Sequence, residues 1–131
     1  MDIARTMEAA ERSAALWRQP EYRDRTVAAA RAGRARVKAG EGYLYVAEML
    51  GTDVVKLGFS LNPKNRVRKT WSFQFRGSTG PRLMAFTPYT FLQERALHRT
   101  LREHQIGSCG EFYPRSILTH EAIPEGLRGA A

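Results

Sequence analysis

The side chains of residues 43–60 alternate with a two-residue period, which is the pattern of a β-strand. One predicted face of the first segment carries Tyr43, Tyr45, Ala47 and Met49, and the other carries Leu44, Val46, Glu48 and Leu50. Residues 54–60 repeat the alternation after a short loop at residues 51–53, so the two segments are predicted to pair as a hairpin. Residues 82–87 form the third predicted strand.

Two helices are predicted around these strands. Thr90 and Gln93 form a capping-box pattern, which places the start of a helix over residues 91–104. Asn62 is a favourable N-cap before Pro63, so a shorter helix is predicted from residue 63 to about residue 70.

The N-terminal stretch has a different pattern, because it is rich in Ala and Arg and lacks a wide apolar stripe. Pro20 divides it into two predicted helices, residues 3–17 and 21–38. Glycines at positions 40 and 42 follow. The chain is therefore predicted to comprise a basic helical arm (residues 1–39), a compact domain (residues 41–118) and a flexible tail (residues 119–131).

The distribution of charged residues indicates the kind of partner that the protein binds. The chain has 131 residues, 21 of them basic and 13 acidic, with a net charge of +8. No acidic residue lies between Asp53 and Glu94. An excess of positive charge concentrated in this way favours a polyanion as the partner, which net charge alone does not identify. The basic side chains expected to contact it are Arg18, Arg23, Arg25, Arg31 and Arg34 in the arm and Lys64, Arg68 and Lys69 in the domain.

Several classes of protein are excluded by the same composition. No apolar run approaches the roughly 18 residues of a membrane span, so no membrane partner is expected. The first residues are charged where a signal peptide is apolar, which predicts a cytoplasmic protein. Cys109 is the single cysteine, so it forms no internal disulfide, and its spacing from the histidines fits no compact zinc pattern.

Five side chains are candidates for chemistry. Glu94 and His98 are four residues apart on one helix, so both can face one ion or substrate atom. A carboxylate suits a hard cation, and a neutral imidazole accepts a proton. Tyr45 and Lys56 lie on adjacent predicted strands and can orient or deprotonate a water, while Arg66 can hold a phosphate through paired hydrogen bonds. Each also has an ordinary structural interpretation, as a core histidine, an exposed ion pair, a strand aromatic or a surface cation.

The order of these residues resembles the GIY-YIG nuclease superfamily, and more closely its bacteriophage-type DNA-binding branch. Residues 43–45 stand at the GIY position, residues 55–60 (VKLGFS) at the YIG position, and Asn62-Pro63 with Arg66 in the next helix. The last helix carries Glu-x-x-Leu-His, from Glu94 to His98, and Gly-Glu-Phe-Tyr follows at residues 110–113. The resemblance covers about residues 42–115.

The resemblance implies an α+β fold with a three-stranded antiparallel sheet flanked by helices, and metal-dependent cleavage of a DNA phosphodiester. Tyr45 would help to activate the water, with Lys56 at the position of the superfamily's second tyrosine. Arg66 would stabilise the pentacovalent phosphate, and Glu94 would hold one Mg²⁺ or Mn²⁺. His98, the last residue of the Glu-x-x-Leu-His run, stays a catalytic candidate as a proton acceptor. The superfamily's late asparagine has no clear counterpart.

The arm is similar to the modular helices found beside homing-type nucleases of this superfamily, because Trp17 to Arg23 precede an Ala/Arg-rich helix. An Ala/Arg bias also arises easily from nucleotide composition. Two alternatives to an endonuclease stay open: a catalytically inactive DNA-binding module of the same fold, and an RNA-binding accessory protein.

Overall fold

The computed structural model of the chain describes residues 10–12, 14–15, 18–69 and 77–129. They fall into two compact units, Met1–Ala35 and Arg36–Ala131. Among the described residues, no helix has the length and apolar character needed to cross a membrane.

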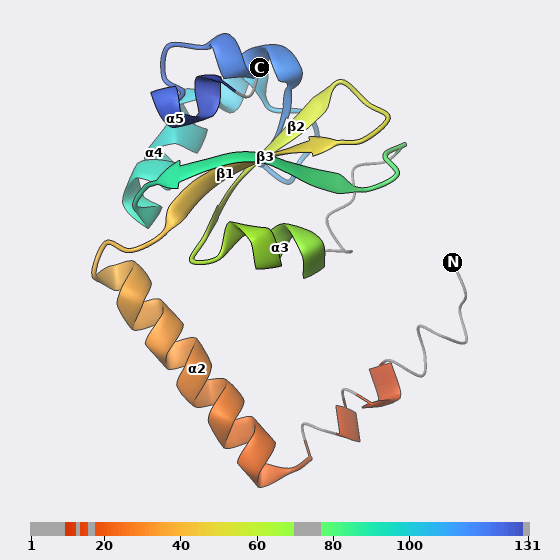
Figure 1. The fold of residues 1–131 in the computed structure, drawn as a ribbon, viewed down its shortest axis with the longest axis vertical. Helices are drawn as coiled ribbons and strands as arrows, with labels where there is room; N and C mark the ends of the chain where they lie inside the picture. The colour runs from red at the N-terminus through yellow and green to blue at the C-terminus, as the bar shows by residue number, and fades with distance from the viewer. Residues whose placement is uncertain (1–9, 13, 16–17, 70–76, 130–131) are drawn as a thin grey trace. The chain divides into compact units, whose positions relative to one another are not determined.

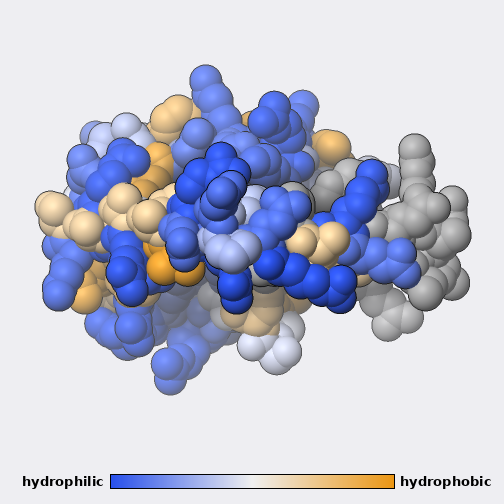
Figure 2. Space-filling view, turned by 90° about the horizontal axis from the view of Figure 1, so that it is seen from below, coloured by the Kyte–Doolittle hydropathy of each residue, from blue (hydrophilic) through white to orange (hydrophobic). Residues whose placement is uncertain are grey.

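Helix α2 (Pro20–Lys38) confirms the predicted second helix of the arm, and none of its residues is buried. The five arm arginines expected to contact DNA are all exposed. Of the predicted helix at residues 3–17, residues 10–12 and 14–15 are helical and the remainder lies outside the described residues. Figure 2 shows a face dominated by hydrophilic side chains, with apolar residues in small separate groups.

The second unit is built on an antiparallel sheet of four strands in the order β3-β1-β2-β4. The strands are β1 (Tyr43–Met49), β2 (Val54–Ser60), β3 (Pro81–Pro88) and β4 (Phe112–Pro114). The predicted hairpin and third strand are confirmed, and the prediction of a three-stranded sheet is wrong. The sequence pattern missed β4 because three residues are too few to show a period.

Helices cover both faces of this sheet. Helix α3 (Pro63–Lys69) lies on one side, and α4 (Phe91–Thr100) and α5 (Glu125–Arg128) lie on the other (Figure 1). Two 3₁₀ helices complete the unit, η2 (Arg102–His104) and η3 (Arg115–Thr119). The predicted capping box at the start of α4 is confirmed, with Thr90 and Gln93 bonded to each other's backbone N–H groups.

The alternation predicted for β1 divides the core into two clusters. Leu44, Val46, Val55 and Leu57 face α4, and Leu97 and Leu101 of that helical segment pack against them. Tyr45, Ala47 and Met49 form the opposite cluster with Phe112, and Val67 of α3 packs there. Both faces of the sheet are therefore covered.

The predicted flexible tail is the second correction. Ile123 and Leu127 are 1% and 0% exposed and belong to the same core cluster as Leu44. Arg128 also donates hydrogen bonds to backbone carbonyls of Glu121 and Ile123. Tail residues up to 129 are consequently part of the folded unit, because their apolar side chains complete the face of the sheet that α4 covers only in part.

Candidate active site

The phenol of Tyr45 lies at the centre of the predicted site. Tyr45 pairs with Gly58 across the β1–β2 hairpin and is 1% exposed. Its ring crosses directly over the glycine, because a Cβ atom built on Gly58 would lie 2.4 Å from the phenol oxygen. Gly58 thus provides the space that lets the tyrosine ring lie across β2.

Lys56 lies on the same face of β2, two residues before Gly58. Lys56 is 4% exposed, and its Nζ atom lies 6.0 Å from the centroid of the Tyr45 ring. The same atom is 3.6 Å from Oε2 of Glu111. Burial lowers the pKa of Lys56, and the charge of Arg66 lowers it further, while Glu111 raises it. The prediction that Tyr45 and Lys56 lie on one wall of the hairpin is confirmed.

Arg66 of α3 reaches this wall from the covering helix. Burial raises the pKa of Tyr45; Arg66 opposes that rise through its charge and a side-chain hydrogen bond. The carboxylates of Glu111 and Glu94 raise the pKa of Tyr45 as well. The charges of two carboxylates and the arginine, which come from α4, the segment before β4 and α3, therefore all act on this phenol. Arg66 itself is an exposed residue, accessible to a ligand.

Glu94 and His98 contact each other along α4, as their spacing predicts. Oε1 of Glu94 lies 2.7 Å from Nε2 of His98, and the two side chains are 10% and 15% exposed. The contact lacks the alignment of a hydrogen bond, and Nε2 is buried without another partner. The alternative in which Glu94 pairs with a neighbouring surface arginine is not observed among the described ion pairs.

Three further side chains in this region were given no role by the sequence analysis. Glu111 pairs with Lys56, and Tyr113 and Gln105 form hydrogen bonds beside His98. The Gly-Glu-Phe-Tyr run was the available signal for two of them. Their partners depend on the pairing of β4 with β2, which the sequence pattern did not reveal.

The donor set fits one kind of metal. In the part of the chain that the structure describes, no three His, Cys, Asp or Glu side chains gather into a cluster. A cage made wholly of protein ligands is therefore not formed there. Mg²⁺ commonly uses one or two carboxylates and completes its shell with water and substrate phosphate. Glu94, a nearly buried carboxylate whose charge acts on the Tyr45 phenol, fits that mode.

The basic residues predicted to contact DNA lie on exposed surfaces. Lys64, Arg68 and Lys69 are exposed on α3, the helix that also carries Arg66. Arg68 donates a hydrogen bond to Oδ1 of Asn65, 3.3 Å away. The same short helix thus presents three outer cations and one cation directed to the phenol.

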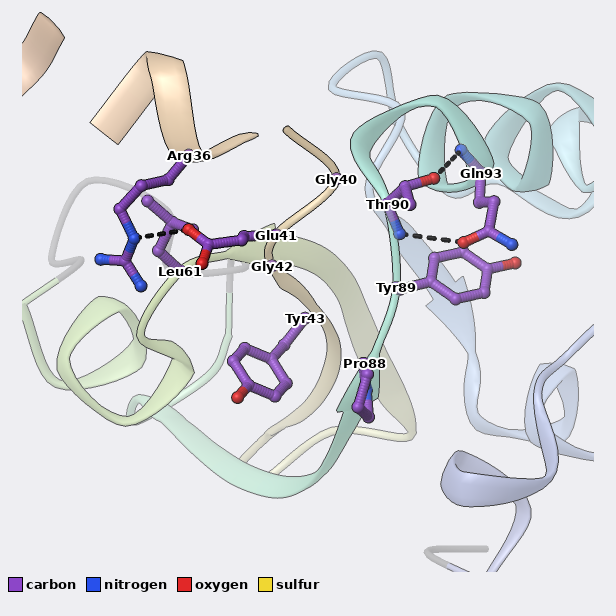
Figure 3. Close-up of a pocket in the computed structure, with 10 residues that line it drawn as sticks. All are labelled: Arg36, Gly40, Glu41, Gly42, Tyr43, Leu61, Pro88, Tyr89, Thr90 and Gln93. Atoms are coloured by element: carbon purple, nitrogen blue, oxygen red, sulfur yellow. Dashed lines mark hydrogen bonds and ion pairs between the residues drawn. The ribbon is translucent and has the colours of Figure 1, made fainter. Parts of the chain in front are cut away.

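A pocket of about 410 Å³ lies at a different place in this unit, beside the start of β1 and the capping box of α4 (Figure 3). Tyr43 and Tyr89 line it, and an ion pair between Arg36 and Glu41 closes one side. None of the five predicted catalytic and metal-binding residues lines this pocket.

Comparison of the chain with family models, with curated proteins and with solved structures finds no match.

Proposed function

We propose that this protein is a DNA endonuclease of the GIY-YIG type, which hydrolyses phosphodiester bonds with a divalent metal ion. The observation that carries the proposal is that Arg66 bonds the buried Tyr45 phenol beside Lys56, while the charge of Glu94, from a separate helix, also acts on that phenol. Phosphodiester hydrolysis needs a cation facing the phosphoryl oxygens, a group that handles the proton of the attacking water, and an anionic metal ligand. This site offers side chains for all three roles.

Arg66 is the residue for the scissile phosphate. It is exposed on α3 while its side chain bonds the Tyr45 phenol, so a bound phosphate would meet both groups. A guanidinium presents a planar set of donors that matches two phosphate oxygens. In this role Arg66 stabilises the additional negative charge of the transition state.

Lys56 and Tyr45 share the handling of the proton. Burial raises the pKa of the Tyr45 phenol, so this hydroxyl group stays protonated and orients the water by hydrogen bonding. Burial lowers the pKa of Lys56, which increases the fraction of neutral amine available to accept a proton. The lysine at the second tyrosine position is thus suited to act as the general base.

Glu94 is the proposed ligand for Mg²⁺ or Mn²⁺. When bound, such an ion supplies positive charge that stabilises the leaving oxygen and the phosphate. The side chain of Glu94 is 10% exposed, so the surrounding protein restricts the positions that its carboxylate can adopt.

The basic surfaces supply affinity for DNA. The exposed arginines of α2 and the outer cations of α3 can each contact a backbone phosphate, and such contacts carry no base specificity. Binding through several of them falls steeply as salt concentration rises.

Nicking of supercoiled plasmid in the presence of Mg²⁺ or Mn²⁺ tests the proposal. We expect cleavage by the unaltered protein and loss of cleavage in Glu94→Gln, with retained DNA binding. Equal nicking by both proteins would reject Glu94 as the metal ligand, and cleavage that survives removal of divalent ions would reject the metal requirement.

A catalytically inactive DNA-binding module is the second candidate, favoured by the contacts that Lys56 and Glu94 make within the protein. Lys56 faces Glu111, and one oxygen of Glu94 faces His98. This candidate predicts salt-sensitive binding to DNA without cleavage by any divalent ion.

A further inference from the structure

A chain of polar contacts runs from the loop before β4 to the carboxylate of Glu94. The Nε2 atom of Gln105 lies 3.1 Å from the carbonyl oxygen of Gly110 and 2.9 Å from the hydroxyl oxygen of Tyr113. That hydroxyl group lies 2.6 Å from Nδ1 of His98. The opposite ring nitrogen of His98 then lies 2.7 Å from Oε1 of Glu94.

The amide nitrogen of Gln105 is the donor at the start of this chain. Gln105 faces the carbonyl of Gly110 and, at 3.3 Å, the carbonyl of His98, and a carbonyl only accepts. The amide group therefore presents its nitrogen, which donates to the oxygen of Tyr113. Tyr113 then has its own hydrogen for Nδ1 of His98. When Tyr113 donates to Nδ1, the ring hydrogen of His98 lies on Nε2, the nitrogen beside Glu94.

Packing holds this arrangement in place. Tyr113 is 0% exposed, and its ring stacks on that of His98 with an interplanar angle of 13°. The Nε2 atom of His98 is shielded from solvent and has no aligned hydrogen bond. A buried donor without a partner is unfavourable, and the carboxylate of Glu94 is the acceptor within reach.

We propose that Tyr113 and Gln105 act through His98 as positioning residues for the carboxylate of Glu94. The contact engages Oε1 and leaves the second oxygen to bind the divalent ion, so the carboxylate coordinates through one oxygen in a fixed orientation. His98 is then a positioning residue with both ring nitrogens directed at protein groups. The inference rests on the proposed role of Glu94 as metal ligand.

Tyr113→Phe tests this role, because it removes the oxygen atom that links Gln105 to His98 and retains the ring. We expect binding of Mn²⁺, measured by titration calorimetry on the full chain, to weaken by about 10- to 100-fold. The kcat for plasmid nicking at subsaturating Mn²⁺ should fall as well, with an unchanged KM for DNA. Tyr89→Phe is the matched control, because its hydroxyl group lies at the pocket of Figure 3.

Gln105→Met provides a second variant with similar side-chain volume and no donor. It should weaken Mn²⁺ binding in the same direction while leaving Tyr113 and His98 unaltered. His98→Gln, whose amide can still donate to Glu94, should retain more Mn²⁺ affinity than His98→Leu. A loss of thermal stability without any change in Mn²⁺ affinity would assign these residues a structural role and overturn the inference.

Failure of the proposed function gives a different result. If the unaltered protein and Glu94→Gln bind Mn²⁺ equally, Glu94 is no ligand, and both proposals fall together. If the unaltered protein loses affinity on Glu94→Gln but not on Tyr113→Phe or Gln105→Met, the positioning role alone is rejected.

Discussion

The two faces of the sheet carry side chains of different chemistry, although β1 and β2 contribute to both. On one face, Leu44 and Leu57 are 0% exposed and pack against apolar side chains of α4, η3 and α5. On the other face, Tyr45 is buried beside Lys56, and its phenol is bonded by Arg66 of α3. Burial of apolar side chains on the first face stabilises the fold, whereas burial of the Lys56 amine on the second face is destabilising. The comparison predicts that substitutions on the two faces separate stability from activity.

Truncation on the apolar face should have the largest effect. Leu57→Ala removes a side chain that is 0% exposed, and we expect the free energy of unfolding to fall by about 2–5 kcal/mol. Urea denaturation followed by circular dichroism measures this loss. Leu92→Ala, at a residue that is 77% exposed, is the matched control and should leave stability nearly unchanged. Equal losses in the two variants would show that the core does not lie where this face places it.

Loss of the arginine on the other face should affect the rate instead. Arg66→Ala removes the cation proposed to face the phosphate, and nicking should slow by about 100- to 1,000-fold, or roughly 3–4 kcal/mol in activation free energy. Its free energy of unfolding should fall by about 1–3 kcal/mol at most, because the buried Tyr45 phenol loses one hydrogen-bond partner. Arg99→Ala on α4 removes an equal charge and serves as the control. A large loss of stability in Arg66→Ala, with a normal rate, would contradict the division between the faces.

Gly58→Ala should affect both properties, because it crowds Tyr45 from the opposite strand. The added Cβ would lie 2.4 Å from the phenol oxygen, and Tyr45 is too buried to move aside freely. We expect a loss of about 1–3 kcal/mol in stability together with slower nicking. Gly129→Ala meets no atom within 4 Å and has no positive φ, so it is the control for adding a methyl group. A fully active Gly58→Ala would show that the position of the phenol is unimportant.

The pH dependence of stability gives the smallest predicted effect. Folding lowers the pKa of Lys56 below its ordinary value of 10.5. At pH values between the folded and the unfolded pKa, the unfolded chain therefore still holds a proton that the folded chain has released. Stability from this residue therefore rises as pH approaches 10, by less than about 1.4 kcal/mol per pH unit. Tyr45 acts in the opposite sense only above its ordinary pKa of 10.0, because folding raises that value.

Urea denaturation between pH 7 and pH 10 tests this sign in the unaltered protein and in Lys56→Met. The variant should lose the part of the rise that Lys56 contributes. Parallel curves for the two proteins would mean that Lys56 titrates alike in the folded and unfolded chains.

Local sequence patterns were sufficient for most of the elements. The two-residue period of residues 43–60 predicted the hairpin and put Tyr45 and Lys56 on one face, since side chains of paired strands alternate together. The capping box and the Asn62-Pro63 signal likewise placed the starts of α4 and α3. α4 ends at Thr100, earlier than the predicted His104, because Leu101 departs from helical geometry before a 3₁₀ turn.

Long-range packing decided what those patterns left out. The strand β4 is too short to show a period and is defined by its hydrogen bonds to β2. The tail is folded because Ile123 and Leu127 find a core assembled by distant strands, which no local signal reports.

By itself, the sequence determined the hairpin, the helix starts, the basic surfaces and the residue types available for phosphate chemistry, since each depends on neighbours along the chain. Only the tertiary structure decided that Glu111 faces Lys56, that Gln105 and Tyr113 reach His98, and that Arg66 meets the Tyr45 phenol. These contacts join residues from different elements, and their distances are set by how the sheet packs against its helices.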